Sequence, residues 1–174
     1  MDGRDSASLE ELAAGKENGP MKYALITGAS RGIGAAAARE FARRGWGVAV
    51  NYLSSRDRAE TLVRELSGMG VPALAVRADV ADRRQVQEMV DNVLEKFCQL
   101  DILVCNAGVS ETGLVSQIDE ERWRRLFTVN VDGVHHCCQA VLPHMIHRKA
   151  GSIVTVSSTV SYTHLRAHET SAHL

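Results

Sequence analysis

Short continuous runs of apolar residues alternate with amphipathic stretches along most of the chain. Such runs are typical of strands buried in a parallel sheet, and they predict five strands: Tyr23–Thr27, Gly47–Asn51, Ala73–Val76, Leu100–Cys105 and Ser152–Ser157. Between the strands, apolar residues recur at helical spacing and predict helices at 33–44, 56–67, 86–97 and 119–147. Strands that alternate with helices build βαβ units, so the sequence predicts an α/β fold with one parallel sheet.

The two ends of the chain lack this alternation. Residues 1–20 are polar, and we expect a flexible N-terminal extension, or sequence upstream of a start at Met21. Residues 160–174 (VSYTHLRAHETSAHL) show no amphipathic period either. They resemble one translated frame of the transposon end and adapter used to prepare sequencing libraries, so we expect a non-native tail here. The patterned domain is then residues 21–159, interrupted after its fifth strand.

The charge balance excludes several classes of partner. The 174 residues carry 20 Lys and Arg against 21 Asp and Glu, a net charge of −1, so we expect no nucleic acid and no membrane partner. No apolar run reaches the roughly 18–20 residues of a membrane span, and residues 1–20 do not resemble a secretory signal. We therefore expect a cytoplasmic protein whose four cysteines stay reduced.

The run His135-His136-Cys137-Cys138 contains residue types that bind metal ions. Neighbouring residues on a helix point about 100° apart, so at most two of these side chains can reach one ion. The sequence therefore predicts no metal site.

The first predicted strand leads directly into a glycine-rich turn and then a helix. The turn is Gly28-Ala29-Ser30-Arg31-Gly32-Ile33-Gly34. Gly28 permits the tight turn, Gly32 lets the main chain approach a pyrophosphate, and Gly34 lets helix and strand pack closely. The free N–H groups at the start of the helix favour an anion. Strand, turn and helix in this order predict a dinucleotide site.

With Thr27 in front, the turn becomes TGASRGIG and resembles the cofactor motif of the short-chain dehydrogenase/reductase family. Four further matches follow in order: Asp79-Val80, Cys105-Asn106-Ala107-Gly108, Asn130-Val131 and Val156-Ser157-Ser158. The resemblance implies a Rossmann-type doubly wound parallel sheet, here truncated after strand five. It implies cofactor contacts from Gly28, Ser30, Arg31, Gly32, Ile33, Gly34, Asn51, Asp79, Val80, Asn106, Ala107 and Gly108, with Asp79 at the adenine ring. Cys105 departs from the family's Asn-Asn-Ala-Gly, and we expect this to alter a strand-stabilising hydrogen bond.

The resemblance also implies that Asn130 is catalytic and binds a water molecule of the proton relay. By helical spacing, Asn130 shares a stripe with four apolar residues, Trp123, Leu126, Phe127 and Val134. An unpaired buried amide costs roughly 1–3 kcal/mol, so we expect Asn130 on a buried face with hydrogen-bonding partners.

Ser158 is the second catalytic residue that the resemblance implies, and its role is to polarise the substrate carbonyl. The family also has a proton-donating Tyr roughly 13 residues later, with a Lys four positions beyond it. Tyr162 follows Ser158 too closely to cross the active site, and Arg166 is not a titratable ammonium group. We therefore reject this pair as catalytic.

The choice between cofactors depends on charge at the end of the second strand. NAD sites usually have an acid there, which binds the ribose 2′-hydroxyl. Here the chain has Val50-Asn51-Tyr52, with no acid, and Arg31 and Arg56 can each pair with a 2′-phosphate. The sequence therefore favours NADP(H).

Together with the resemblance, these features predict NADPH-dependent reduction of a carbonyl to a hydroxyl, on a small-molecule or carrier-bound substrate. TGASRGIG and the VNY strand end most resemble 3-oxoacyl-[acyl-carrier-protein] reductases of fatty acid biosynthesis, and the family implies a homotetramer. The helix after Asp119 and the VSS strand end also resemble reductases of 5-aminopentanone on elongation factor P. A non-catalytic dinucleotide-binding protein is a further alternative. We expect the 174-residue chain as it stands to be inactive.

Overall fold

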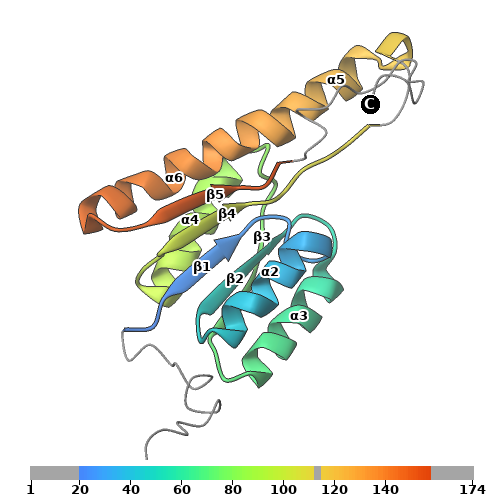
Figure 1. Ribbon diagram of the computed structural model, residues 1–174. Helices are drawn as coiled ribbons and strands as arrows, with labels where there is room; N and C mark the ends of the chain where they lie inside the picture. Colours follow the sequence, from blue (N-terminus) through green and yellow to red (C-terminus); the bar gives the residue numbers. More distant parts are fainter. Residues whose placement is uncertain (1–19, 112–114, 158–174) are drawn as a thin grey trace, which may run out of the picture.

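A five-stranded parallel sheet forms the centre of the molecule. The computed structural model describes residues 20–111 and 115–157, whose arrangement is shown in Figure 1. The strands are β1 (Tyr23–Ile26), β2 (Gly47–Tyr52), β3 (Ala73–Arg77), β4 (Ile102–Cys105) and β5 (Ser152–Thr155), in the order β3-β2-β1-β4-β5. The predicted α/β fold with a parallel sheet is therefore confirmed. The expected N-terminal extension and non-native tail lie outside the described residues.

Helices cover both faces of the sheet (Figure 1). On one face α2 (Gly32–Arg43) and α3 (Arg56–Gly68) pack, and on the other α4 (Arg83–Phe97) and α6 (Gly133–Arg148). Successive strand residues point to opposite faces, so Leu25 joins the core beneath α4 and α6 whereas Ile26 joins the core beneath α2 and α3. Both are fully buried, which explains why β1 is a continuous apolar run.

The long helix predicted over 119–147 is divided. It consists of α5 (Glu120–Phe127), a five-residue π-helical segment η2 (Thr128–Asp132) and α6, and a short 3₁₀ turn η1 (Val115–Gln117) precedes it. No residue of α5 is buried, and Trp123 and Phe127 are 49% and 48% exposed. The expected buried stripe is therefore wrong here, because α5 continues directly into η2 and extends past the end of the sheet, where no described strand covers it (Figure 1).

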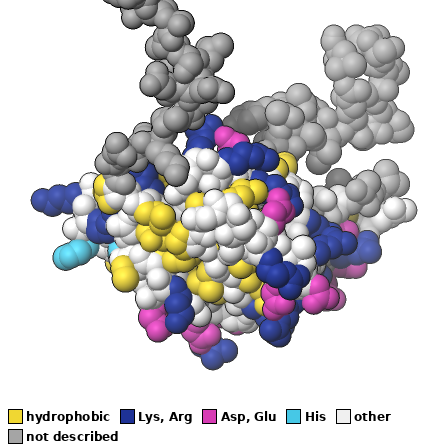
Figure 2. All heavy atoms as spheres, turned by 90° about the horizontal axis from the view of Figure 1, so that it is seen from below, with side chains coloured by type: hydrophobic (Ala, Val, Ile, Leu, Met, Phe, Trp, Pro, Cys, Tyr) yellow, Lys and Arg dark blue, Asp and Glu magenta, His cyan; other side chains and the backbone are white. Residues whose placement is uncertain are grey.

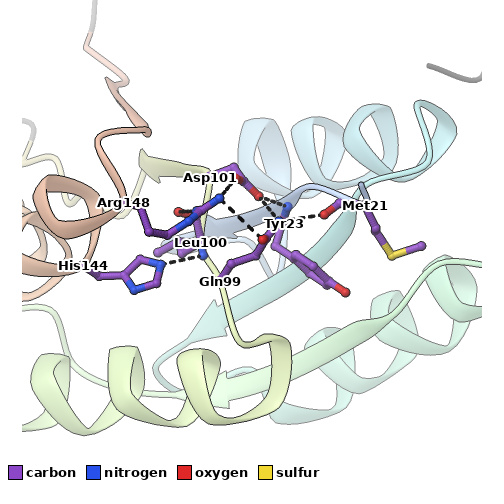
Figure 3. Close-up of polar contacts among 7 residues, drawn as sticks. All are labelled: Met21, Tyr23, Gln99, Leu100, Asp101, His144 and Arg148. Atoms are coloured by element: carbon purple, nitrogen blue, oxygen red, sulfur yellow. Dashed lines mark hydrogen bonds and ion pairs between the residues drawn. The ribbon is translucent and has the colours of Figure 1, made fainter. Parts of the chain in front are cut away.

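Polar side chains join β1, β4 and α6 at the end of the sheet where the strands begin (Figure 3). The carboxylate of Asp101 accepts the N–H of Tyr23 at 2.8 Å and pairs with Arg148 at 3.0 Å. Arg148 also donates to the carbonyl of Leu100 at 3.1 Å, and Nε2 of His144 accepts the N–H of Leu100 at 3.2 Å. These bonds fix the C-terminal half of α6 against β4, at the opposite end of the sheet from the loops described below.

Charged groups of both signs are interspersed on one face of the molecule (Figure 2). Figure 2 shows the face seen from below, where Lys and Arg lie among Asp and Glu, and hydrophobic side chains reach the surface between them. Within the described ranges, no helix is long and apolar enough to cross a membrane.

Candidate cofactor site

A cleft of about 930 Å³ lies at the carboxyl ends of the strands. The loops that follow β1, β2, β3 and β4 line it together with the junction of α5 and η2: residues 28, 30–33, 51–55, 78–81, 106–109, 125, 128 and 129. In open parallel sheets, ligands bind where the strand order reverses direction, which here is between β1 and β4. The cleft therefore lies where this topology places a dinucleotide.

The structure brings nearly all of the expected cofactor residues together. Every predicted cofactor-binding residue except Gly34 lines the cleft. Asn130 is close to it but does not line it, and Ser158 lies outside the described residues. The lining also contains residues that the sequence analysis did not propose, among them Ser54, Ser55 and Arg125.

The three positions of the turn require glycine for different structural reasons. A Cβ on Gly28 would lie 2.8 Å from Cα of Ala107, and one on Gly34 would lie 2.5 Å from Nδ2 of Asn106. Both glycines therefore let the turn touch the loop after β4. Gly32 has a φ of +58°, and a Cβ there would meet no described atom within 4 Å. The space over the start of α2 is therefore open to a ligand.

Thr27 joins the loops after β1 and β4 by hydrogen bonds, a role that was not predicted from the sequence. Its buried hydroxyl accepts the N–H groups of Asn106 at 2.9 Å and Ala107 at 3.0 Å, and donates to the carbonyl of Val104 at 3.4 Å. In the opposite direction, the side-chain amide of Asn106 donates to the carbonyls of Thr27 and Gly28. The sequence feature that could have indicated this role is the position of Thr27, a polar residue directly after an apolar strand.

Asn51 lines the cleft, but its side-chain amide is bound to the glycine turn and to the next loop. Its Oδ1 accepts the N–H of Gly28 at 3.1 Å, and its Nδ2 donates to the carbonyl of Ala78 at 3.1 Å. Its own carbonyl accepts the N–H of Ala29 at 2.9 Å. The amide is 1% exposed, so these bonds satisfy a polar group that burial would otherwise make costly.

Asn130 is bound to the loop after β4. Its Oδ1 accepts the N–H of Val109 at 2.9 Å, and its Nδ2 donates to the carbonyl of the same residue at 2.8 Å. Asn130 lies within η2, where the wider π-helical turn shifts the side-chain directions relative to an α-helix. The amide has partners, but Asn130 is exposed, so the expected buried face is wrong.

Positive charge exceeds negative charge in the lining of the cleft. The basic residues of the lining are Arg31 and Arg125, and the acidic residue is Asp79. The carboxylate of Asp79 accepts the N–H of Ala81 at 2.9 Å. Arg56 does not line the cleft; its guanidinium pairs with Glu60 at 2.6 Å, which raises the pKa of Arg56. The balance of charges favours an anionic ligand, and Arg31 is better placed than Arg56 to meet it.

Cys105 packs as an apolar residue at the end of β4. It is buried beside Cys137, whose proximity, together with burial, raises the pKa of the Cys105 thiol and keeps it protonated. Its carbonyl accepts the N–H of Val156 at 2.9 Å. Across the described part of the chain, no group of three His, Cys, Asp or Glu residues is arranged to hold a metal ion.

Comparison with known proteins agrees with this geometry. The family model of the short chain dehydrogenases matches residues 22–170. The 3-oxoacyl-[acyl-carrier-protein] reductase FabG of Staphylococcus epidermidis is 41% identical over 139 residues, which cover 80% of this chain and 57% of that protein. The 3-oxoacyl-[acyl-carrier-protein] reductase of a Synechocystis species is 39% identical over 79% of this chain and 56% of its own length.

A solved structure also resembles this one. A mutant short-chain dehydrogenase/reductase from Serratia marcescens superposes with a TM-score of 0.78 at 34% identity, over 83% of this chain and 58% of that chain. The chain therefore spans somewhat over half the length of the relatives it matches. The fold, the turn after β1 and the matching family model together show that this chain belongs to the short chain dehydrogenase family.

Proposed function

We propose that this chain forms the dinucleotide-binding part of an NADP(H)-dependent carbonyl reductase that resembles the 3-oxoacyl-[acyl-carrier-protein] reductases. The observation that carries the proposal is the cleft itself, in which Arg31 lies on the glycine turn and no acid lies at the end of β2. The names of its relatives supply the reaction class.

The residues of the cleft fit a dinucleotide. The left-handed Gly32 leaves the start of α2 open, and the first N–H groups of that helix suit a pyrophosphate. The loops after β2 and β3 would then hold the adenosine half, and the loop after β4 would hold the nicotinamide half. The bound nicotinamide supplies a hydride, and the protein holds it, orients it and excludes water.

Arg31 is proposed to bind the ribose 2′-phosphate. A planar guanidinium can contact a phosphate through two N–H groups, and Arg31 has the exposure to do so. The hydroxyls of Ser54 and Ser55 line the same side of the cleft, just before α3, and add donors there. Asn51, which takes the place of an acid in this position, neither repels the phosphate nor competes for a ribose hydroxyl, because its amide is engaged within the protein.

The catalytic roles proposed for Asn130 and Ser158 come from the family. Asn130 holds Val109 at the rim of the cleft and keeps one N–H and one lone pair for a water molecule. Ser158 polarises the carbonyl of a small-molecule or carrier-bound substrate. Because Tyr162 and Arg166 do not meet the family's spacing, we propose that the 174 residues alone do not reduce a ketone. The family further suggests that the complete protein is a cytoplasmic homotetramer.

The test is the cofactor preference of the protein translated from the intact chromosomal reading frame. A bidentate Arg–phosphate contact is worth roughly 1.5–3 kcal/mol, so we expect about ten- to hundredfold preference for NADPH over NADH, and loss of most of it in Arg31→Ala. Arg56→Ala is the matched control, because Arg56 is paired with Glu60 outside the cleft lining. Equal affinity for both cofactors, or an unchanged preference in Arg31→Ala, would contradict the proposal. NADPH binding with no reduction of any 3-oxoacyl substrate would instead favour the non-catalytic alternative.

A further inference from the structure

A histidine on α6 holds the loop between β3 and α4. The Nδ1–H of His136 donates to the carbonyl oxygen of Val80 at 3.0 Å. A carbonyl can only accept, so Nδ1 carries the proton in this contact. Val80 is 6% exposed and lines the cofactor cleft, so the bond links the helix directly to the wall of the site.

Gly133 lets α6 approach Val80 closely enough for this bond. A Cβ at Gly133 would lie 2.9 Å from Cγ2 and 3.2 Å from Cβ of Val80, closer than side chains normally pack, so a side chain here would displace Val80 or the helix. Gly133 begins α6, and His136 follows it by three residues, so both face the same loop. The helix therefore touches Val80 at two points.

The same loop is also held from the sheet side and from α4. Nδ2 of Asn51 donates to the carbonyl of Ala78 at 3.1 Å, and the N–H of Asp79 donates to Oε1 of Gln85 at 3.0 Å. These bonds hold the two residues before Val80, whereas the carbonyl of Val80 itself is bound by His136. Three consecutive loop residues are thus each held by a different element.

We propose that His136 is a positioning residue for the adenine half of the dinucleotide. The inference rests on the proposed function, because the glycine turn places the pyrophosphate and the β2 end places the ribose, so the loop after β3 lies where the adenine follows. His136 acts through the main chain of Val80: it holds that carbonyl toward α6 and so fixes the main chain of the loop that lines the cleft. His136 does not touch the cofactor itself.

The experiment compares two ligands in the protein translated from the intact reading frame. NADPH carries both halves of the dinucleotide, whereas 2′,5′-ADP carries only the adenosine half. His136→Phe keeps a ring of similar size but removes the donor, and we expect it to weaken both ligands by the same factor, about three- to tenfold. The kcat at saturating NADPH stays unchanged, since the nicotinamide half is not moved.

Two further variants separate positioning from general stability. In His136→Asn the amide nitrogen occupies nearly the place of Nδ1, so we expect it to restore affinity for both ligands. His147→Gln, an exposed histidine in the last turn of the same helix, is the matched control and leaves affinity unchanged. If His136→Phe does not fold, His136→Leu carries the same comparison.

The inference is overturned if a folded donor-free variant binds 2′,5′-ADP as tightly as the wild type does. It is also overturned if only NADPH binding is weakened, or if His136→Asn does not recover affinity. Failure of the wild type to bind either ligand is a separate result, which overturns the proposed function and this inference with it.

Discussion

Asn130 holds the main chain of Val109 by both ends of its amide, accepting from the N–H at 2.9 Å and donating to the carbonyl at 2.8 Å. This paired contact joins η2 to the loop after β4, whose residues line the cofactor cleft. An Asn at this place therefore acts on the shape of the site in addition to any water it binds.

Replacement of Asn130 tests that structural role. We expect Asn130→Ala to lose two exposed hydrogen bonds, to lower stability by about 1–2 kcal/mol, and to raise the Kd for NADPH several-fold. Thermal unfolding and a fluorescence titration with NADPH measure the two effects. The exposed Asp132, at the end of the same segment, gives a control in Asp132→Ala. A variant with unchanged NADPH affinity and a reduced kcat would show that Asn130 serves the water relay alone.

Gly32→Ala and Gly34→Ala should each lower the free energy of unfolding, but for different physical reasons. Gly34→Ala places a methyl group 2.5 Å from Nδ2 of Asn106 and 2.9 Å from Cα of Ala29, so we expect a loss of about 1–3 kcal/mol from overpacking. Gly32→Ala meets no described neighbour, and its left-handed backbone costs about 1–2 kcal/mol. Chemical denaturation checks both values.

The matched variant Gly32→Asn separates backbone strain from ligand approach. Asn tolerates the left-handed conformation, so stability should largely recover. Affinity for NADPH should remain about tenfold lower or worse, since any side chain at this position stands between the start of α2 and a pyrophosphate. Full recovery of affinity would show that the open space over Gly32 is not where the cofactor binds.

His144 should make the stability of this protein fall as the pH is lowered below about 7. Its Nε2 accepts the N–H of Leu100, so this nitrogen is unprotonated in the folded state (Figure 3). Burial lowers the pKa of His144, and the nearby Arg148 lowers it further against the opposing effect of Asp101. The unfolded chain therefore binds the proton more readily, so stability is fully present above the unfolded pKa of about 6.5 and is lost as the pH falls through the folded pKa.

The measurement is the urea midpoint at several pH values. In His144→Gln the side-chain oxygen can accept the same N–H without titrating, so we expect a flatter profile between pH 7 and 5. Carboxylates whose pKa is lowered, Glu40, Glu65 and Asp82, act at lower pH and leave this window clear. Identical slopes for wild type and variant would refute the assignment.

The parts of the fold that depend on neighbouring residues could be predicted from the sequence. Each strand of the sheet is a local apolar run, and the ends of the strands differ from prediction by only one or two residues. The turn from Gly28 to Gly34 was predictable because part of the need for glycine is local: Gly28 and Gly32 have a positive φ, and a Cβ on Gly34 would meet Ala29. Its contact with the loop after β4 was not, since Ala107 and Asn106 are far along the chain.

The environment of α5 and η2 could not be predicted in the same way. Helical spacing places Trp123, Phe127 and Asn130 on one stripe, but spacing does not say whether another element covers that stripe. The π-helical turn keeps ordinary helical composition, so the sequence carries no mark of it. The bond between His136 and Val80 likewise joins residues 56 positions apart and follows only from the packing of α6 on the sheet.

We expect the chromosomal reading frame to depart from VSYTHLRAHETSAHL within one or two residues of Ser158. It should then supply a Tyr about 11–14 positions after Ser158 and a Lys four positions beyond, because residues four apart lie on one face of a helix. The ammonium group of that Lys lowers the pKa of the Tyr from about 10 toward neutrality, as a general acid requires.

Sequencing the locus from unamplified DNA tests this expectation. The match to the family model extends to residue 170 and so includes Tyr162 and Arg166, but four residues after Ser158 are too few for the chain to leave β5, pass the cofactor and begin a helix. If the tail proves continuous with genuine coding sequence, the adapter interpretation is wrong. Activity of that protein would then require a proton donor other than a Tyr paired with a Lys, and Tyr162→Phe would become an informative variant.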